Sequence, residues 1–373
     1  MARGAAAAPV VPGYPPAFMD LRPLIEAAHG APHGRVEALA FAARCAQARH
    51  VEHASAAREI EELVPCGCMA LLMADWLAGG RAPLAALGDE EGARVDASLP
   101  PVWDAHVHVF PDRLFAASWR WFEQHGWPIR YPLLAPEGAS FLLSRGVERA
   151  VLLHYAHKPG LARSMNTFVA ELCASEPRLI GLATVLPGEP DAARIVREAA
   201  RLGLRGIKLH CHVQAFAPDS EEAAEVLGVA EELGMPVVIH AGREPRSPAL
   251  PVDTYAVCAA ERTERVLQRF PRLRVCVPHF GGDEFDVYAK LLDRFDNLYL
   301  DTTMMLSGFF TGANVPMRLL SARPERILYG TDFPNLPYAW DRELRVLRDL
   351  RLPEEALAQV LAGTARELFS VAA

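Results

Sequence analysis

The sequence predicts a (β/α)8 barrel at residues 99–373, preceded by an all-helical segment at residues 1–98. Two observations support this fold class. After about residue 100, eight short runs rich in Val, Ile and Leu alternate with amphipathic helical segments. Polar side chains follow nearly every run at its carboxyl end, which is where barrel enzymes carry their active sites.

Composition limits the classes of partner. The chain has 373 residues, of which 51% are hydrophobic, with a formal net charge of −8 and a pI near 5.9. This acidic balance argues against nucleic acid or an anionic membrane as the main partner. Seven cysteines, an odd number spread along the chain, do not fit a disulfide framework, so we expect a cytoplasmic protein. We also expect no signal peptide and no membrane span.

Residues 1–16 are rich in Ala and Pro and show no periodicity, whereas residues 18–87 show a helical pattern with few β-branched runs. Apolar residues recur at helical spacing over residues 35–49, and Gly79-Gly80 ends a further apolar helix. A charged, proline-ending linker at residues 88–101 leads into the barrel. We expect this segment to form a cap on the barrel or a subunit contact, in a protein that forms a homo-oligomer.

The barrel elements follow in order. Helices between the strands have clear ends: Asp219 or Ser220 caps a helix with acidic residues in its first turn, and Gly234 ends it. Runs that are apolar on both faces fit parallel strands covered by helices. The predicted strands are residues 102–108, 149–154, 179–185, 204–210, 236–240, 274–279, 297–301 and 326–331.

A doubly wound parallel sheet is the structural rival, because it is built from the same alternation of strands and helices. No glycine-rich phosphate loop follows the first strand, however. A doubly wound sheet also gives no reason for polar residues at nearly every strand end. The barrel is therefore the favoured fold.

The strand ends carry an unusual set of ionisable residues. His106 and His108 close the first strand, and two imidazoles on the same face can share one metal ion. Asp104 is expected on that face too, deeper in the barrel, where it accepts a hydrogen bond or orients a ligand histidine. Buried polar groups cost free energy unless they have partners, so this ring implies a metal or a substrate. The later members are His154, Lys208, His210, His212, His240, His279, Asp301, Thr302, Thr303 and Asp332.

Five segments resemble one family. They are D-A-H-V-H-V-F (104–110), V-V-I-H-A-G (237–242), V-P-H-F-G-G (277–282), L-Y-G-T-D-F-P (328–334) and the final G-T-A-R-E-L-F (363–369). Together they resemble the amidohydrolase superfamily, and within it the branch related to aminocarboxymuconate-semialdehyde decarboxylase. The resemblance covers residues 101–370.

The resemblance implies one divalent metal ion, most plausibly zinc, with manganese as the alternative. Its ligands would be His106, His108, His240 and Asp332. His279 would polarise the substrate oxygen or relay a proton, and Asp332 would also take a proton from the attacking water. These roles agree with the chemistry of a zinc site that has nitrogen and oxygen ligands and an open position.

Lys208, His210 and Arg243 are the candidate substrate-binding residues. In part of the superfamily a lysine on strand four becomes carboxylated and bridges two metals, so Lys208 has that alternative. We favour one metal, with Lys208 and His210 contacting the substrate. Arg243 could grip a substrate carboxylate with two hydrogen bonds, although a solvated loop arginine is nearly as good an interpretation.

Three functions are consistent with this pattern. The first is a metal-dependent hydrolase of an amide, lactone or ester. The second is a nonoxidative decarboxylase of a carboxylated aromatic or unsaturated acid, because the branch contains both chemistries. The third is a non-catalytic binding barrel, against which the complete ligand set argues. In each case the expected partner is a small molecule. For the two enzyme hypotheses, a substrate that carries a carboxylate is one expectation.

Overall fold

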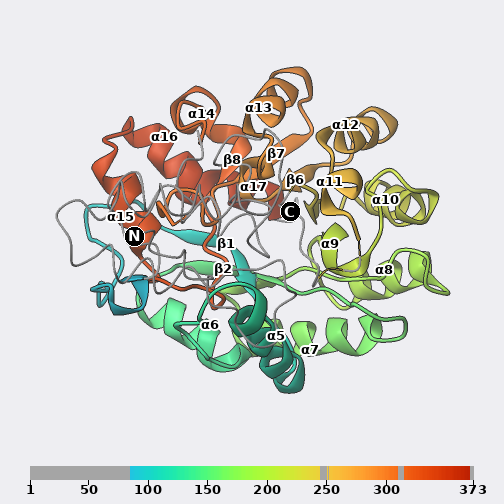
Figure 1. Ribbon diagram of the computed structural model, residues 1–373, viewed down its shortest axis with the longest axis horizontal. Coiled ribbons are helices and arrows are strands. Elements are labelled where there is room, and N and C mark those ends of the chain that lie inside the picture. The colour runs from blue at the N-terminus through green and yellow to red at the C-terminus, as the bar shows by residue number, and fades with distance from the viewer. Residues whose placement is uncertain (1–84, 244–249, 251, 310–314, 370–373) are drawn as a thin grey trace, which may run out of the picture.

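The computed structural model describes residues 85–243, 250, 252–309 and 315–369, and there the chain forms a barrel of parallel strands inside a ring of helices (Figure 1). The predicted fold class is therefore confirmed. The strands are shorter than the apolar runs suggested, because several runs continue into turns that carry polar residues. They are β1 (Trp103–His108), β2 (Arg149–Leu153), β3 (Leu179–Gly181), β4 (Ile207–His210), β5 (Val237–His240), β6 (Val275–Val277), β7 (Leu298–Asp301) and β8 (Ile327–Leu328).

Regular hydrogen bonding divides the barrel wall into two sheets, β1-β2-β3 and β4-β5-β6-β7-β8. Two parallel bridges join these sheets. Ala183, just after β3, pairs with Ile207, and Val107 of β1 pairs with Phe333, just after β8. The amide of Lys208 donates to the carbonyl of Ala183 at 2.7 Å, and the amide of His108 donates to the carbonyl of Phe333 at 2.7 Å. The wall is therefore closed.

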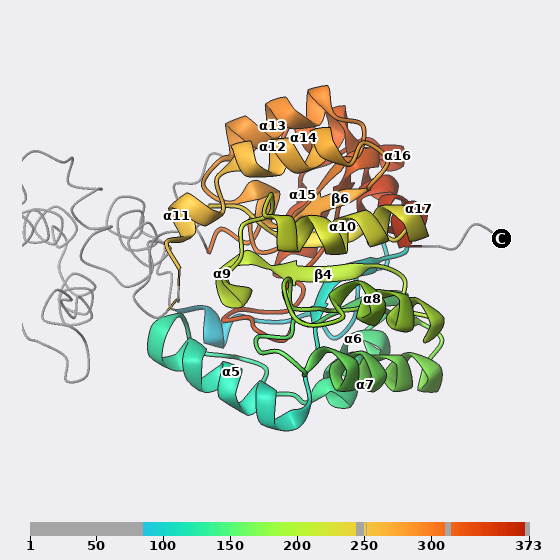
Figure 2. The ribbon, with the colours of Figure 1, turned by 90° about the vertical axis from the view of Figure 1, so that its right-hand side faces the viewer.

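The helices cover the outside of this wall (Figures 1 and 2). Ser220 caps α10 by accepting from the Ala223 amide, and Gly234 ends it with a φ of 65°, as the sequence predicted. The helical elements are η1 (Ala85–Gly88), α5 (Asp112–His125), α6 (Ala135–Ser144), α7 (Ala162–Ser175), α8 (Ala192–Arg201), α9 (Cys211–Gln214), α10 (Glu221–Leu233), α11 (Thr254–Val257), α12 (Ala260–Arg269), η2 (His279–Gly281), α13 (Phe285–Arg294), α14 (Leu319–Ala322), η3 (Pro324–Arg326), α15 (Arg342–Asp349), α16 (Glu354–Ala358), η4 (Gln359–Gly363) and α17 (Thr364–Phe369).

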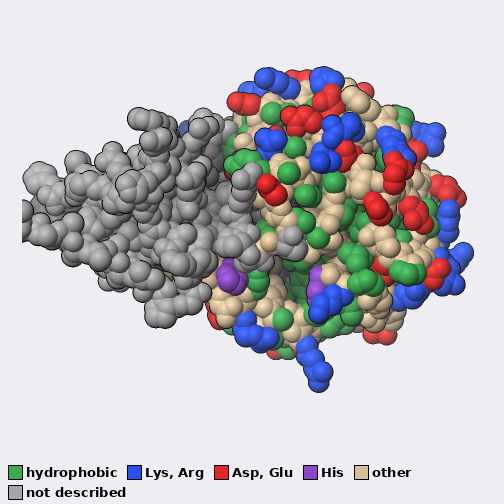
Figure 3. Space-filling model, turned by 45° about the vertical axis from the view of Figure 1, so that its right-hand side comes forward, with side chains coloured by type: hydrophobic (Ala, Val, Ile, Leu, Met, Phe, Trp, Pro, Cys, Tyr) green, Lys and Arg blue, Asp and Glu red, His purple; other side chains and the backbone are tan. Residues whose placement is uncertain are grey.

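Neighbouring outer helices are joined by ion pairs. Basic and acidic side chains are interspersed on the face drawn in Figure 3, as this pattern requires. Exposed pairs of this kind contribute little stability individually, about 0–1 kcal/mol each, so the apolar core beneath them holds the helices in place. The pairs are Arg163–Glu198 (α7–α8), Arg197–Glu232 (α8–α10), Arg269–Glu221 (α12–α10) and Arg294–Glu264 (α13–α12).

The barrel interior is filled by its own apolar cluster. Inward-facing residues such as Val151, Ile180 and Val238 pack with Leu368 and Phe369 of α17. Figure 2 places α17 at one end of the barrel and α9, which follows β4 directly, at the other. α17 therefore closes the amino-terminal end, and the carboxyl ends of the strands remain available for polar side chains. None of the helices in the described ranges is long and apolar enough to cross a membrane.

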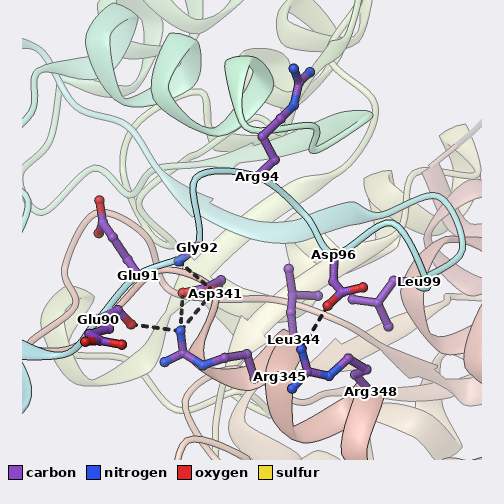
Figure 4. Close-up of a pocket in the computed structure, with 10 residues that line it drawn as sticks. All are labelled: Glu90, Glu91, Gly92, Arg94, Asp96, Leu99, Asp341, Leu344, Arg345 and Arg348. Atoms are coloured by element: carbon purple, nitrogen blue, oxygen red, sulfur yellow. Dashed lines mark hydrogen bonds and ion pairs between the residues drawn. The ribbon is translucent and has the colours of Figure 1, made fainter.

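The segment just before β1 is bound to the barrel (Figure 4). The Gly92 amide donates to Asp341 at 3.0 Å, and Arg345 of α15 donates to Asp341 and to the Glu90 carbonyl, each at 2.9 Å. Arg348 pairs with Asp96 at 2.9 Å. The described part of the expected N-terminal segment thus lies against α15. Its helical prediction for residues 1–84 falls outside the described residues, and the domain boundary at residue 98 stays a prediction.

Candidate metal centre

Three predicted ligands meet where β1 and the turn after β8 lie side by side. Nε2 of His108 lies 3.1 Å from Oδ1 of Asp332, and Nε2 of His106 lies 3.3 Å from the same oxygen. All three side chains are buried, and their ligand atoms lie within 4.8 Å of one another. The Asp332 amide donates to the His106 carbonyl at 2.9 Å, which fixes this spacing. The arrangement can hold a divalent metal ion.

The predicted alignment of Asp104 with the two histidines is wrong. Asp104 pairs with Ala150 of β2, whereas His108 pairs with Leu153, and the register shifts between Asp104 and Val107. Because Ala150 and Leu153 are an odd number of residues apart, they lie on opposite faces of β2, and their partners do too. Strict alternation fails here because a bulge interrupts it, a feature common beside active sites.

Asp104 instead joins β1 to the turn after β8. Its carboxylate accepts from the Thr331 hydroxyl at 2.6 Å and from the amides of Thr331 and His106, each at 3.1 Å. Burial raises the pKa of Asp104 to about 7, although these hydrogen bonds act in the opposite direction. The Asp104 carboxylate thus supports β1 by accepting from the His106 backbone amide, and it does not contact a histidine ring in these hydrogen bonds.

The His106 ring is held on both of its nitrogens. Nδ1 lies 2.8 Å from Oδ2 of Asp301, the last residue of β7, and Nε2 lies 3.4 Å from Nζ of Lys208 on β4. Burial and the charge of Lys208 hold the pKa of His106 well below its usual value. The imidazole is therefore neutral, which is the form that binds a metal.

Two buried side chains of this centre have shifted pKa values. Burial lowers the pKa of Lys208 to about 8, against the opposing effect of Asp301 and Asp332. For Asp332, burial acts to raise the pKa, but its contact and hydrogen bond with His108 hold the pKa below the usual range. Asp332 is consequently a carboxylate at neutral pH, and Lys208 carries a positive charge inside the barrel.

The other predicted histidines form a second group next to the ligands. The rings of His210 and His240 stack with centroids 4.2 Å apart, and the His240 ring lies 4.7 Å from that of His279. The His279 ring is in turn 5.7 Å from that of His106. His240 is therefore close to the cluster, yet its ligand atoms are not among those that lie within 4.8 Å of one another. Its role as the fourth ligand stays a prediction.

His279 is held in a strained conformation. Its φ is 57°, in the left-handed region that favours glycine, and Asp332 has a φ of 78°. Nδ1 of His279 lies 2.9 Å from the Thr303 carbonyl, so it carries the hydrogen, and the His279 amide donates to Asp301 at 2.9 Å. Strained residues that several hydrogen bonds hold in place are typical of functional sites.

Arg243 and His154 have partners away from the ligand cluster. Nε of Arg243 donates to the Tyr255 carbonyl at 3.1 Å, and its guanidinium pairs with Glu284 at 3.4 Å, so its role with a substrate stays a prediction. Nε2 of His154 lies 2.9 Å from the Leu182 carbonyl, and the side chain is fully buried. These contacts favour a structural role for His154.

Comparison with known proteins places this chain in a family. A family model described as amidohydrolase matches residues 103–371. The chain belongs to the amidohydrolase family. The match spans all eight strands and both ends of the ligand set, so the resemblance inferred from the five segments is confirmed.

A single related protein matches a shorter part of the chain than the family model does. A curated relative from Dictyostelium discoideum, named 2-amino-3-carboxymuconate-6-semialdehyde decarboxylase, is 29% identical over 151 residues, which cover 35% of this chain and 42% of that relative. The match therefore spans less than half of the relative's length.

Solved structures share the fold at lower identity. An uncharacterised TIM-barrel protein from Bordetella bronchiseptica is 20% identical, with a TM-score of 0.55 over 72% of this chain and 98% of that chain. A 5-carboxyvanillate decarboxylase from Novosphingobium aromaticivorans, complexed with manganese and 4-hydroxy-3-methoxy-5-nitrobenzoic acid, is 16% identical. Its TM-score is 0.52 over 76% of this chain and 100% of that chain.

Proposed function

We propose that this chain is a metal-dependent decarboxylase that removes CO2, without oxidation, from a carboxylated aromatic or unsaturated acid. The observation that carries the proposal is the His106, His108 and Asp332 cluster at the carboxyl end of the barrel. Proteins named as decarboxylases are among those similar to this chain, both in sequence and in fold. These similarities favour nonoxidative decarboxylation, the second hypothesis drawn from the sequence, over hydrolysis.

The donor set suits a divalent cation. Two imidazole nitrogens and one carboxylate oxygen are ligands that both zinc and manganese accept. We propose zinc, with His240 as a fourth ligand, and keep manganese as the alternative because the 5-carboxyvanillate decarboxylase structure contains it. When bound, the cation would polarise the substrate oxygens and stabilise the negative charge that remains after CO2 leaves.

The side chains of this site then divide the work. Lys208, with its buried ammonium group beside His106, attracts the acidic substrate. Asp332 stays ionised and therefore acts as a ligand rather than a proton donor. In decarboxylation the carbon–carboxylate bond breaks, CO2 leaves, the electron pair stays on carbon, and that carbon takes one proton. His279 is the proposed source, because its Nδ1 is occupied by Thr303 and its Nε2 remains for the proton.

Hydrolysis of an amide, lactone or ester would use the same residues, so the experiment must separate the two reactions. The full-length protein, loaded in turn with zinc and manganese, is assayed with hydroxybenzoates that carry a 13C-labelled carboxylate, and with lactones and amides. We expect labelled CO2 and, in D2O, one deuterium on the carbon that lost the carboxylate. Turnover of lactones or amides without CO2 release would contradict the proposal in favour of hydrolysis.

His279 variants test the assignment of the proton source. H279N keeps a side-chain donor for the Thr303 carbonyl but lacks the second nitrogen, so we expect kcat to fall by about 10²–10⁴. Metal content should stay at the wild-type level. H157Q, at an exposed histidine after β2, is the matched control and should keep wild-type kcat. Wild-type kcat in H279N would remove His279 from the mechanism.

A further inference from the structure

Asp301 uses both oxygens of a buried carboxylate to hold two parts of the site. The residue is 1% exposed. Oδ2 accepts from Nδ1 of His106 at 2.8 Å. Oδ1 accepts from the backbone amide of His279 at 2.9 Å and from that of Thr303 at 3.2 Å. One side chain on β7 therefore contacts a ring on β1 and the backbone after β6.

These contacts determine which nitrogen of His106 carries its hydrogen. Oδ1 of Asp301 already accepts from two backbone amides, and where Oδ2 also accepts, Nδ1 of His106 is the donor, so Nε2 of the neutral ring has the lone pair. Nζ of Lys208, which is only a donor, lies 3.4 Å from Nε2, whereas Oδ1 of Asp332, an acceptor, lies 3.3 Å from the same nitrogen, so a cation between Nε2 and Asp332 would complete this arrangement. The lone pair of Nε2 thus points toward the group formed with His108 and Asp332.

The same carboxylate also supports His279, whose φ of 57° is unfavourable for a residue with a side chain. The Asp301 hydrogen bond to its amide and the Thr303 carbonyl on its Nδ1 fix this backbone and its ring together. A change at Asp301 is thus expected to act on two residues that come from different strands.

We propose that Asp301 is a positioning residue that sets the tautomer of His106 for metal binding and fixes the backbone of His279. This inference rests on the proposed metal-dependent function. Residues that orient a metal-binding histidine through its other nitrogen typically change metal affinity 10–100-fold when replaced.

The variant D301N separates the two roles of Asp301. Asparagine keeps one oxygen that can accept from the amides of His279 and Thr303, but it places an NH2 donor against Nδ1 of His106. The ring must then carry its hydrogen on Nε2, the nitrogen that should face the metal. We therefore expect the dissociation constant for zinc to rise about 10–100-fold, measured by competition with a chromophoric chelator on the full-length protein.

A spectroscopic measurement tests the tautomer directly. In 15N-histidine NMR of the metal-free chain, His106 should carry its hydrogen on Nδ1 in the wild type and on Nε2 in D301N. E343Q is the matched control, because Glu343 is also buried and accepts from the amides of Met304 and Leu306 at 3.1 and 2.7 Å. Its zinc affinity and its His106 tautomer should equal those of the wild type.

The outcomes distinguish this inference from the proposed function. If D301N binds zinc like the wild type and keeps the Nδ1 hydrogen, the role of Asp301 is wrong although the metal site stands. If the wild type binds neither zinc nor manganese, the proposed function fails, and the tautomer still decides the role of Asp301. If D301N does not fold, an Nε2 hydrogen on His106 in the wild type would by itself overturn the inference.

Discussion

Acid should destabilise this protein partly through His154. Burial lowers the pKa of this imidazole from 6.5 to about 4, although its hydrogen bond to the Leu182 carbonyl acts in the opposite direction. The unfolded chain therefore takes up a proton near pH 6.5, whereas the folded chain takes it up only near pH 4. The stability that His154 contributes is complete above pH 6.5 and is lost as the pH falls to 4. At roughly 1.36 kcal/mol per pH unit, the loss over this window is about 3 kcal/mol.

The variant H154Q isolates this contribution. Glutamine can keep the donor to Leu182 but does not titrate, so its free energy of unfolding relative to wild type should improve by about 2–3 kcal/mol between pH 8 and pH 4.5. Urea unfolding followed by tryptophan fluorescence, at four pH values and with a chelator present, measures this difference. H157Q, at an exposed histidine three residues from His154, is the control and should show a smaller dependence of the unfolding free energy on pH. A difference between H154Q and wild type that does not change with pH would refute the reasoning.

Three further predictions concern the site and its supports. Removing divalent metal with a chelator should lower the thermal midpoint of the wild type but not of an H106A/H108A double variant, because bound metal contributes about 2.7 kcal/mol at a 100-fold excess over Kd. G330A should lower the free energy of unfolding by about 1–3 kcal/mol and weaken metal binding, because its Cβ would lie 2.7 Å from the Cβ of His106. G228A in α10 is the control, because its nearest neighbour would lie 3.8 Å away. Equal urea midpoints for the two variants would contradict this account. D341A should lower the free energy of unfolding by about 1–3 kcal/mol, because the Gly92 amide and Arg345 lose their shared acceptor. D96A removes the exposed ion pair with Arg348 and should lower it by under about 1 kcal/mol in the same unfolding assay.

The sequence was sufficient to predict the fold and the meeting of three predicted metal ligands. Eight apolar runs of the right length define the strands, and parallel strands bring their carboxyl ends to one end of the barrel. His106, His108 and Asp332 could therefore be placed together from their positions at the ends of β1 and β8. This reasoning needs only the direction of each strand and not its detailed geometry.

The orientation of individual side chains could not be predicted in the same way. Asp104 was placed on the ligand face because alternation was assumed, and the bulge in β1 reverses that placement. Asp301 was noted as a polar strand end but received no role, because its partners lie on β1 and after β6. Which acidic side chain faces which histidine depends on stagger around the barrel, and no local pattern in the chain records it.

Three aspartates explain why the first strand carries this site. Asp104 ties β1 to Thr331, Asp301 reaches His106 from β7, and Asp332 meets both ligand histidines from the turn after β8. β1 is an edge strand of its sheet, so regular strand pairing leaves one of its sides open. Each of the three aspartates joins β1 to residues of β7 or of the turn after β8, across this closing seam of the barrel. The hydrogen bonds that complete this wall are therefore the ones that orient the predicted ligands. The cost of the positive φ angles at His279 and Asp332, about 1–3 kcal/mol each, is offset by the same network. A change that weakens this seam should accordingly lower stability and metal affinity together, whereas a change on the far side of the barrel should lower stability alone.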